Sequence, residues 1–393
     1  MASTSWLTLS LTPGIGPILA RRIVDATGSA TAACEASIAT LRNIEGIGTA
    51  RADKIGAGLR SARDKAAEQL ARAAAAGASV ICPDDDAYPF LLREIPDPPC
   101  VLFVKGTFEP RDLQAVAIVG SRKCSFYGRE QAERFAALMA GSGVCVISGG
   151  ARGIDSAAHR GALSHPHGRT IAVLGSGVDV PYPPENAKLF EQIAARGAVV
   201  SEYPMGTPPT PENFPKRNRI VSGMSRGVLV VEADERSGAL ITARQAIDDH
   251  NRIVFALPGR VDTATSAGPH KLIRDGATLV RNLEDILEEL PPLSDKASAP
   301  ASNLFEQVEQ GLTAMPTATP VPTPPPAPPS PVGLSERQLR ILGHLDGQPM
   351  TIDQLVESCA LPAQFVMQDL TMLSLRGLAK RVDGQTYVRG RAR

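Results

Sequence analysis

The sequence has little cysteine. Its 393 residues include six cysteines, and no two of them form a CxxC pair. No histidine stands beside them at the spacing of a zinc site, which argues against both a disulfide framework and a cysteine-based metal centre. We therefore expect no bound metal, and we expect these cysteines to be reduced core residues: Cys34, Cys82, Cys100, Cys124, Cys145 and Cys359.

Long apolar runs and an excess of one charge are also absent. No stretch approaches the roughly 20 apolar residues that span a bilayer, and the N-terminus lacks a basic segment followed by an apolar one. A cytoplasmic protein without membrane contact is therefore expected. The 41 basic and 41 acidic side chains give a formal net charge of zero. Affinity for nucleic acid must then come from local clusters of cations.

Signatures of nucleotide enzymes are missing too. There is no GxxxxGK[ST] motif, which argues against a P-loop NTPase, and Gly175-Ser176-Gly177 lacks the third glycine of a dinucleotide fingerprint. His159 has no recognisable nucleophile and acid at partner spacing, so it is better explained as a satisfied helix residue than as a general base. We predict no catalytic residue, no cofactor and no enzymatic activity.

The length of the chain predicts two or three domains, at roughly 150 residues each. Proline is concentrated after residue 290, and a run rich in Pro, Ala and Thr prefers extended conformations and cannot pack a core. We predict a helical domain at residues 1–65, a connecting segment at 66–107, a core domain at 108–290, a Pro-rich linker at 291–334 and a winged-helix domain at 335–393.

The core domain alternates short apolar runs with helical patterns such as Gly128–Ala140 and Ala239–Asp249. This alternation is typical of a parallel sheet covered on both faces, so we predict an α/β fold with a Rossmann-like, doubly wound parallel sheet. The expected strands are Ala115–Val119, Val144–Ile147, Thr170–Leu174, Ala198–Val200, Val228–Val231 and Ile253–Leu257.

The N-terminal region contains two similar glycine turns, Leu11–Gly16 and Ile44–Gly48. Each precedes a predicted helix with basic residues. This is the helix-hairpin-helix pattern, in which glycine lets backbone N–H groups approach a phosphate at a helix N-terminus. Two tight turns inside a helical bundle explain the pattern equally well, so both interpretations stay open.

The C-terminal region predicts three helices and a hairpin. The helices are expected at 335–345, 351–358 and 362–375, and Asp383-Gly384 is a strong signal for a two-residue hairpin turn. This order is typical of a winged helix, which serves either DNA contact or protein contact. The third helix has no cation before Arg376, which argues against a repressor that reads the major groove.

Three glycine turns follow predicted strands of the core: Gly120-Ser121-Arg122, Gly149–Gly153 and Gly175–Gly177. Ligands of open α/β sheets bind outside the carboxyl ends of the strands, so we expect all three turns to face one crevice. Basic side chains cluster in these loops and in the segment Asn213–Arg226, where Phe214 stands among cations. Arginines along a groove suit a phosphate polymer, and an aromatic among them suits a stacked base of a single strand. The alternative is that Phe214 anchors a loop in the core.

The central region also carries sequence motifs in the order of a known family. They are YPFLLREIPDPPCVLFVKG (88–106), AIVGSR (117–122), SGGARGID (148–155) with Ala158-His159, NFPKRNRIVSG (213–223), Glu232 with SGALITA (237–243), and HKLIRDGA (270–277). Together they resemble the DNA-processing protein A family, DprA or Smf. A helical N-terminal domain and a C-terminal winged helix are common in that family.

The resemblance implies a homodimer that binds single-stranded DNA without sequence preference. It further implies protection of incoming DNA during natural transformation and recombination, and loading of the recombinase RecA. By the same resemblance, arginine and lysine side chains would hold phosphates, Phe214 would stack on a base, and Gly149 and Gly150 would offer backbone donors. The expected DNA-binding residues are Gly120, Ser121, Arg122, Gly149, Gly150, Arg152, Phe214, Lys216, Arg217, Asn218 and Arg219.

An enzyme of related fold is the alternative. Phosphoribohydrolases of the lysine-decarboxylase-like family resemble this core and carry a PGGxGTxxE signature with a catalytic glutamate. Here the corresponding stretch, Glu232–Ala243, lacks both Pro-Gly-Gly and the final glutamate. We expect Glu232 to cap or orient a loop instead, and Glu202 to pair with a nearby arginine.

Overall fold

The computed structural model describes residues 2–290, 336–345, 350–359, 378–381 and 386–389, with the single residues 366, 370 and 373. The chain divides into two compact units, Met1–Thr313 and Ala314–Arg393. The linker expected at 291–334 lies outside the described residues. So do most of the third helix expected at 362–375 and the turn at Asp383-Gly384.

Five helices form the N-terminal part of the first unit. The two predicted glycine turns are present, because Gly14 and Gly46 have φ values of 90° and 86°. Arg51 donates to the carbonyl oxygens of Gly14 (2.9 Å) and Gly46 (3.0 Å), so the turns lie side by side. The helices are α1 (Ala2–Leu11), α2 (Pro17–Thr27), α3 (Ala30–Cys34), α4 (Ile38–Arg42) and α5 (Thr49–Ala75), and α5 continues through residue 65 without a break.

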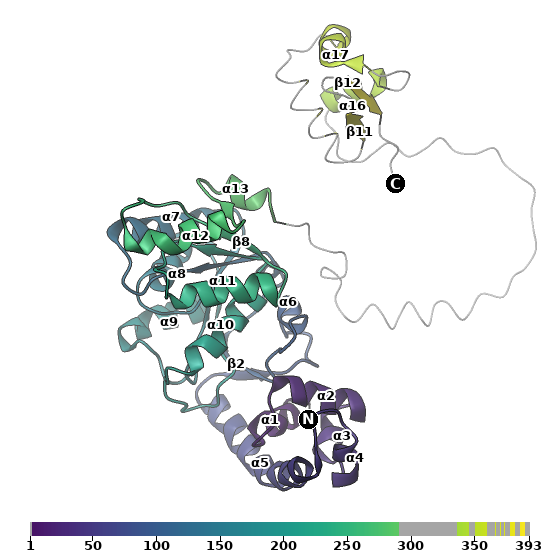
Figure 1. Cartoon of the computed structure of the whole chain (residues 1–393), viewed down its shortest axis with the longest axis vertical. Helices are drawn as coiled ribbons and strands as arrows, with labels where there is room; N and C mark the ends of the chain where they lie inside the picture. The colour runs from purple at the N-terminus through teal and green to yellow at the C-terminus, as the bar shows by residue number, and fades with distance from the viewer. Residues whose placement is uncertain are drawn as a thin grey trace, which may run out of the picture. The chain divides into compact units, whose positions relative to one another are not determined.

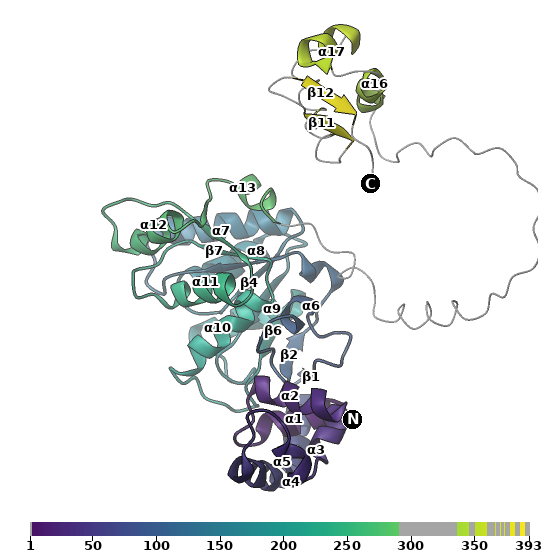
Figure 2. The same cartoon turned by 45° about the vertical axis from the view of Figure 1, so that its right-hand side comes forward.

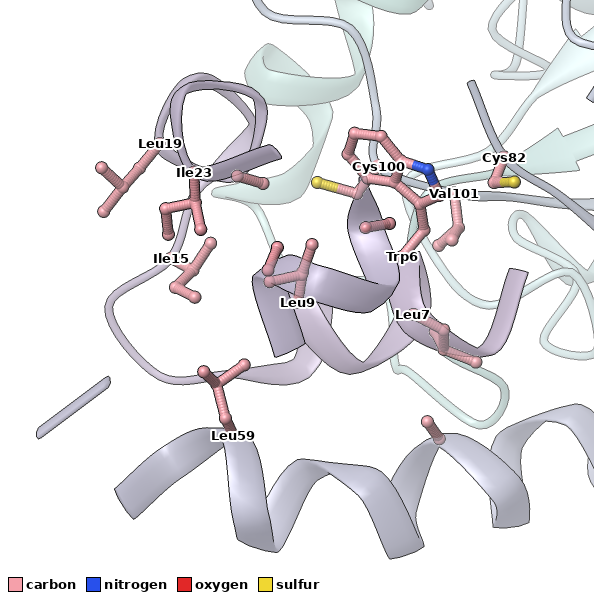
Figure 3. Packing of buried hydrophobic residues seen from close by; sticks show 14 of the residues in the cluster. Trp6, Leu7, Leu9, Ile15, Leu19, Ile23, Leu59, Cys82, Cys100 and Val101 are labelled. Carbon is pink, nitrogen blue, oxygen red and sulfur yellow. The ribbon is translucent and has the colours of Figure 1, made fainter. Parts of the chain in front are cut away.

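The N-terminal helices share a hydrophobic core with the following domain. Trp6 of α1 is buried, and its indole Nε1 donates to a carboxylate oxygen of Asp84 at 2.8 Å. Its ring lies near Cys100 and Val101, which precede a strand of the central sheet (Figure 3). The backbone N–H of Met205 adds a hydrogen bond to the Gln69 side chain of α5 at 2.7 Å. The helical part is therefore packed against the sheet domain.

A nine-stranded sheet forms the centre of the unit, in the order β1-β2-β6-β5-β4-β3-β7-β8-β9. Strands β3 to β9 are parallel to one another, which confirms the predicted doubly wound α/β fold. Strands β1 and β2 add an antiparallel edge that we did not predict in segment 66–107. The strands are β1 (Ser79–Ile81), β2 (Leu102–Gly106), β3 (Ala115–Val119), β4 (Cys145–Ser148), β5 (Thr170–Val173), β6 (Ala198–Ser201), β7 (Gly227–Val230), β8 (Ile253–Ala256) and β9 (Thr278–Leu279).

Helices cover both faces of this sheet (Figures 1 and 2). Strand β3 shows the reason, because its side chains alternate between two buried clusters. Val116 and Ile118 pack with α7 and α8, whereas Ala117 and Val119 pack with α10 and α11. The helices are α6 (Phe90–Arg93), α7 (Phe126–Gly141), α8 (Ile154–Ser164), α9 (Ala187–Arg196), α10 (Asn213–Gly223), α11 (Gly238–Asp248), α12 (Ala267–Arg274) and α13 (Glu284–Leu287).

The strand order reverses between β3 and β7. From β3 the chain adds β4, β5 and β6 on one side, and it then returns to add β7, β8 and β9 on the other. At such a reversal the loops after neighbouring strands diverge and leave a crevice at the carboxyl edge. The topology thus places the ligand site at the ends of β3 and β7.

The second unit contains α16 (Glu336–His344), β10 (Met350–Thr351), α17 (Ile352–Cys359), β11 (Ala379–Arg381) and β12 (Thr386–Arg389). Strand β12 pairs antiparallel with both β10 and β11, as in a winged helix. Three buried residues of the expected third helix, Val366, Leu370 and Leu373, complete its core. Across both units, no helix within the described ranges is long and apolar enough to cross a bilayer.

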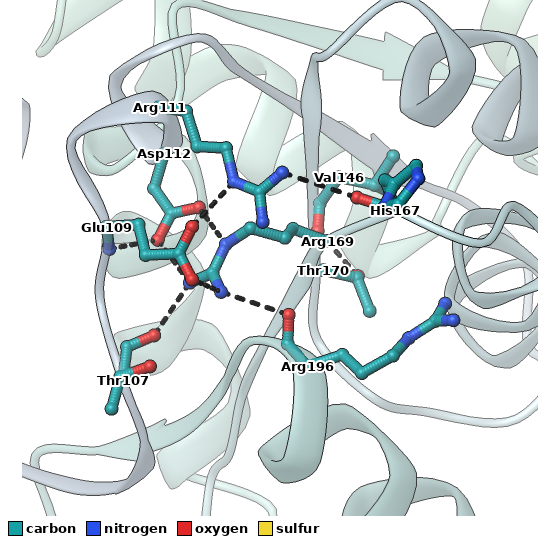
Figure 4. Close-up of polar contacts among 9 residues, drawn as sticks. All are labelled: Thr107, Glu109, Arg111, Asp112, Val146, His167, Arg169, Thr170 and Arg196. Atoms are coloured by element: carbon teal, nitrogen blue, oxygen red, sulfur yellow. Dashed lines mark hydrogen bonds and ion pairs between the residues drawn. The ribbon is translucent and has the colours of Figure 1, made fainter.

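Arg169 organises the amino edge of the sheet (Figure 4). Its side chain is 5% exposed and forms two hydrogen bonds of 2.7 Å with the Asp112 carboxylate. It also donates to Glu109 (2.7 Å) and to the backbone carbonyls of Thr107 (2.7 Å) and Arg196 (3.1 Å). One guanidinium therefore joins the segment before β3 to the end of α9.

We predict that Arg169→Met lowers the free energy of unfolding by about 3–5 kcal/mol, because it leaves the buried Asp112 carboxylate without its partner. The double variant Arg169→Met with Asp112→Leu should recover part of this loss. Urea denaturation followed by circular dichroism measures both. An unchanged midpoint for Arg169→Met would show that the pair contributes nothing.

Candidate nucleic-acid interface

A crevice of about 630 Å³ opens at the strand-order reversal. Its walls come from the loops after β3, β4 and β7 and from the first turns of α10 and α11. Seven of the eleven expected site residues line it: Gly120, Ser121, Arg122, Gly149, Phe214, Arg217 and Asn218. The other four, Gly150, Arg152, Lys216 and Arg219, lie outside the lining.

The loop after β3 is held tightly at its base. A Cβ atom on Gly120 would lie 2.6 Å from Ile154 and 2.7 Å from the Glu232 carbonyl oxygen, so only glycine fits. That carbonyl accepts a hydrogen bond from the Ser121 N–H at 2.7 Å. The Glu232 carboxylate accepts two more from the backbone and hydroxyl of Ser125, at 2.8 and 2.6 Å. Glu232 thus orients this loop, as predicted from the sequence.

Aromatic rings and guanidinium groups meet at the mouth of the crevice. The Arg122 guanidinium lies 5.0 Å from the centre of the Phe214 ring, and the Tyr182 ring lies 5.6 Å from that same ring. Arg152 covers Tyr182 at 6.0 Å, while its guanidinium pairs with the Glu185 carboxylate. Phe214 is half-buried, so it is not a full core anchor. The sequence analysis missed Tyr182, because no glycine turn or basic cluster marks its position.

Arg217 forms the floor of the crevice. Its side chain is only 3% exposed, and its guanidinium donates to the backbone carbonyls of Gly149 and Val173. A Cβ atom on Gly149 would lie 2.5 Å from this guanidinium, which explains the glycine. Burial lowers the pKa of Arg217 to about 10, an effect that nearby Asp155 opposes. Arg217 therefore stays protonated at neutral pH and holds a positive charge beneath the crevice.

Arg219 lies elsewhere than we expected. Its guanidinium forms ion pairs with Asp97 (2.8 Å) and Glu202 (2.7 Å), and the whole residue is buried. One helical turn separates residues three or four apart, so residues 217 and 219 of α10 cannot face the same way. Glu202 pairs with an arginine, as predicted. Arg219 thus fastens α10 to the segment before β2 and is not presented to the crevice.

The third glycine turn is also displaced from the expected position. We expected Gly175–Gly177 to face the crevice, but it does not line it. A Cβ atom on Gly175 would lie 3.0 Å from the Phe214 ring, so this turn is packed beneath the ring. The Asn213 side chain donates to the Gly175 carbonyl at 3.0 Å and fixes the start of α10 there. The turn supports the aromatic residue instead of binding a ligand directly.

His159, the histidine considered as a general base, does not line the crevice. His159 is fully buried, its Nδ1 is 2.7 Å from the Thr170 hydroxyl, and burial lowers its pKa to about 3. Two cations of the lining, Arg122 and Lys123, reach solvent, and Lys216 is exposed outside it. In the part of the chain that the structure describes, no three His, Cys, Asp or Glu side chains gather as metal ligands would. The cations and aromatic rings of the crevice are suited to binding an anion that carries an aromatic group.

Comparison with known proteins agrees with this geometry. Residues 79–291 match the family described as DNA recombination-mediator protein A. The chain belongs to this family. Its members include the proteins named DprA and Smf, so the resemblance seen in the sequence motifs is confirmed. Residues 325–385 match the DprA winged helix domain, and residues 7–61 match a SAM-like helix-hairpin-helix tandem.

Individual relatives show how far the similarity extends. Protein Smf of a Synechocystis species is 37% identical over 395 residues, covering 98% of this chain and 98% of the relative. DNA processing protein DprA of Streptococcus pneumoniae is 45% identical over 205 residues, covering 52% of this chain and 72% of the relative. The X-ray structure of DprA from Streptococcus pneumoniae superposes with a TM-score of 0.64 at 32% identity, covering 75% of this chain and 99% of that one.

We predict that Gly120→Ala destabilises the sheet domain by about 1–3 kcal/mol, because the new methyl group overlaps Ile154 and the Glu232 carbonyl. Gly238→Ala is the matched control, since nothing lies within 4 Å of its added Cβ. That change should alter stability by less than about 1 kcal/mol. Thermal unfolding measures both, and equal midpoints for the two variants would contradict the packing described for the loop after β3.

Proposed function

We propose that the crevice binds single-stranded DNA without sequence preference. The observation that carries this proposal is the cluster of Arg122, Phe214 and Tyr182 in the crevice lining, with the two aromatic rings tilted by 46° to each other. An unpaired base offers its face to an aromatic ring, whereas the bases of a duplex hide their faces against each other. Every base has such a face, so recognition by stacking tolerates any sequence.

The cations supply the second half of this binding mode. Arg122 and Lys123 of the lining are exposed, the buried Arg217 lines the floor, and Lys216 is exposed on the first turn of α10 outside the lining. Arginine and lysine side chains along a groove neutralise successive phosphates and release counterions, which makes affinity strongly salt-dependent. The formal net charge is zero, so this local cluster has to provide the attraction. In this proposal, Arg219 is a positioning residue for α10 and does not contact phosphate.

We predict that Arg122→Ala lowers affinity for single-stranded DNA by roughly ten- to hundredfold, the loss for one charge-assisted hydrogen bond of about 1.5–3 kcal/mol. The loss should be similar for all sequences. The slope of log affinity against log salt should shrink by about 0.7, the value for one phosphate of a single strand. Fluorescence anisotropy with labelled oligonucleotides measures both quantities.

Arg111→Ala is the matched control for this variant. Arg111 is an exposed arginine that precedes β3, so it lies at the amino edge of the sheet, opposite the crevice. Its removal should leave affinity and salt slope unchanged. If Arg122→Ala behaves like Arg111→Ala, the phosphate path does not pass the loop after β3, and the proposed binding mode fails.

The proposed role in the cell follows from this binding. We propose that the protein acts in the cytoplasm, covers incoming single strands during natural transformation and recombination, and loads RecA onto them. The family membership and the relatives named DNA processing protein support this role. The winged helix and the helix-hairpin-helix tandem would then supply further contacts with DNA or with proteins.

We further propose that the crevice binds DNA without catalysing a reaction. The stretch Glu232–Ala243, which corresponds to the catalytic signature of the related hydrolases, lacks the final glutamate, and the Glu232 carboxylate accepts hydrogen bonds from Ser125. We therefore predict that the purified protein releases no free base from adenosine monophosphate above the background of a denatured sample. Chromatography of the reaction mixture is a sufficient assay, and accumulation of adenine would support the enzyme alternative instead.

A homodimer formed by the sheet domain is part of the same proposal. Leu272, Ile273 and Leu279 are candidates for its apolar patch. Leu279 belongs to the edge strand β9 and is 40% exposed, whereas Leu272 packs partly against the core. We predict that a truncated chain ending at Leu290 still sediments as a dimer, and that Leu279→Asp weakens the association of the two subunits. A truncated chain that is monomeric at micromolar concentration would contradict this prediction.

A further inference from the structure

Phe126 is an aromatic residue that does not line the crevice. It is the first residue of α7 and is 72% exposed. Among the large apolar side chains that the structure describes, only Val261 is more exposed. Isolated exposed apolar residues are common on protein surfaces, so exposure alone assigns no role. Its surroundings are what distinguish Phe126.

The backbone around Phe126 is held in place. The Ser125 side chain accepts a hydrogen bond from the Gly128 N–H at 3.0 Å and caps α7, and the buried Glu232 holds Ser125 itself. The Arg129 guanidinium lies 5.3 Å from the centre of the Phe126 ring. In the described part of the chain, no carboxylate forms an ion pair with Arg129. A cation and an aromatic face are therefore presented together on a rigid helix start.

This pair follows closely in the sequence on residues that line the crevice. Lys123 lines the crevice and precedes Phe126 by three residues in the same loop. Arg160 of α8 is paired with Glu133 of α7 at 3.4 Å, whereas Lys123 and Arg129 form no ion pair within the described residues.

We propose that Phe126 and Arg129 form a second stacking position, outside the crevice, for a nucleotide of the strand that leaves it past Lys123. The base would stack on Phe126, and Arg129 would contact the adjacent phosphate. This inference rests on the proposed function of the crevice. The inference extends the DNA-binding site beyond the crevice and assigns a nucleotide contact to the start of α7.

The chemistry favours a nucleic-acid strand over a protein partner. The distance from the guanidinium to the ring centre is similar in the two pairs, at 5.3 Å for Arg129 and Phe126 and 5.0 Å for Arg122 and Phe214. Aromatic platforms between cations are typical of single-strand binding. The neighbouring Tyr127 is also exposed, but its hydroxyl donates to the Pro258 carbonyl at 3.3 Å. The other exposed residues beside Phe126, namely Lys123, Arg129 and Glu130, are charged, unlike the apolar centre of a protein interface.

Oligothymidylates of increasing length test this proposal. Phe126→Ala should leave the affinity for a short oligonucleotide that only fills the crevice unchanged. It should weaken binding of a longer one by roughly fivefold or more, the lower range for a lost base–aromatic contact. Phe126→Tyr should restore the affinity for the longer strand. Leu138→Ala is the matched control, because Leu138 lies on the same helix and is 40% exposed.

Fluorescence gives a readout of contact that does not depend on affinity. The chain has a single tryptophan, Trp6, which is 5% exposed. In a Phe126→Trp variant, the longer oligothymidylate should quench the new tryptophan, and the short one should not. Emission that stays constant while the long strand is bound would overturn the second stacking position.

The outcomes separate this inference from the proposed function. If the unmodified chain binds oligothymidylate and Phe126→Ala binds both lengths equally well, the second position does not exist and the crevice proposal stands. If Arg122→Ala and Phe126→Ala both leave binding of the long strand unchanged, both proposals fail. If a Phe126→Ala defect is equal at both lengths, Phe126 acts on the crevice itself, and the extended path is wrong.

Discussion

The binding site depends on one buried contact, the insertion of the Arg217 guanidinium under the backbone of Gly149. A buried charged group is tolerated only where polar groups form hydrogen bonds with it. Here the backbone carbonyls at the ends of β4 and β5 accept hydrogen bonds from the guanidinium. The start of α10 is thereby pulled against the carboxyl edge of the sheet. Phe214, three residues earlier, is held over Gly175 and below Arg122 as a consequence.

Arg217 and Arg219 of α10 have different hydrogen-bond partners, and this difference explains their different roles in the structure. Arg219 has two carboxylate partners, so it acts as a fastening between α10 and the segment before β2. Arg217 has carbonyl partners only and keeps its charge available beneath the crevice. The buried floor contrasts with the exposed rim formed by Arg122 and Lys123. We interpret the floor as setting the geometry and the rim as providing phosphate contacts.

Most of the sheet could be predicted because each parallel strand is a short, uniformly apolar run followed by a polar turn. All six predicted strands exist, whereas β1, β2 and β9 were missed. Strands β1 and β9 have only three and two residues, too few to show an alternation of apolar and polar side chains. The sequence could not show that Arg217 and Arg219 face different ways, since neither their helix nor its orientation was predicted. The sequence analysis also did not predict Tyr182 as a site residue, for a related reason. It reaches Phe214 only through tertiary packing across the strand ends.

The central claim is that the crevice selects unpaired bases. The most direct test is anisotropy competition on the full chain, in which a labelled mixed-sequence single strand is displaced by unlabelled single strand or by the corresponding duplex, without nucleotide cofactor. The account predicts displacement by the single strand at much lower concentration, and the same order for unrelated sequences. A duplex that competes as well as the single strand would contradict it.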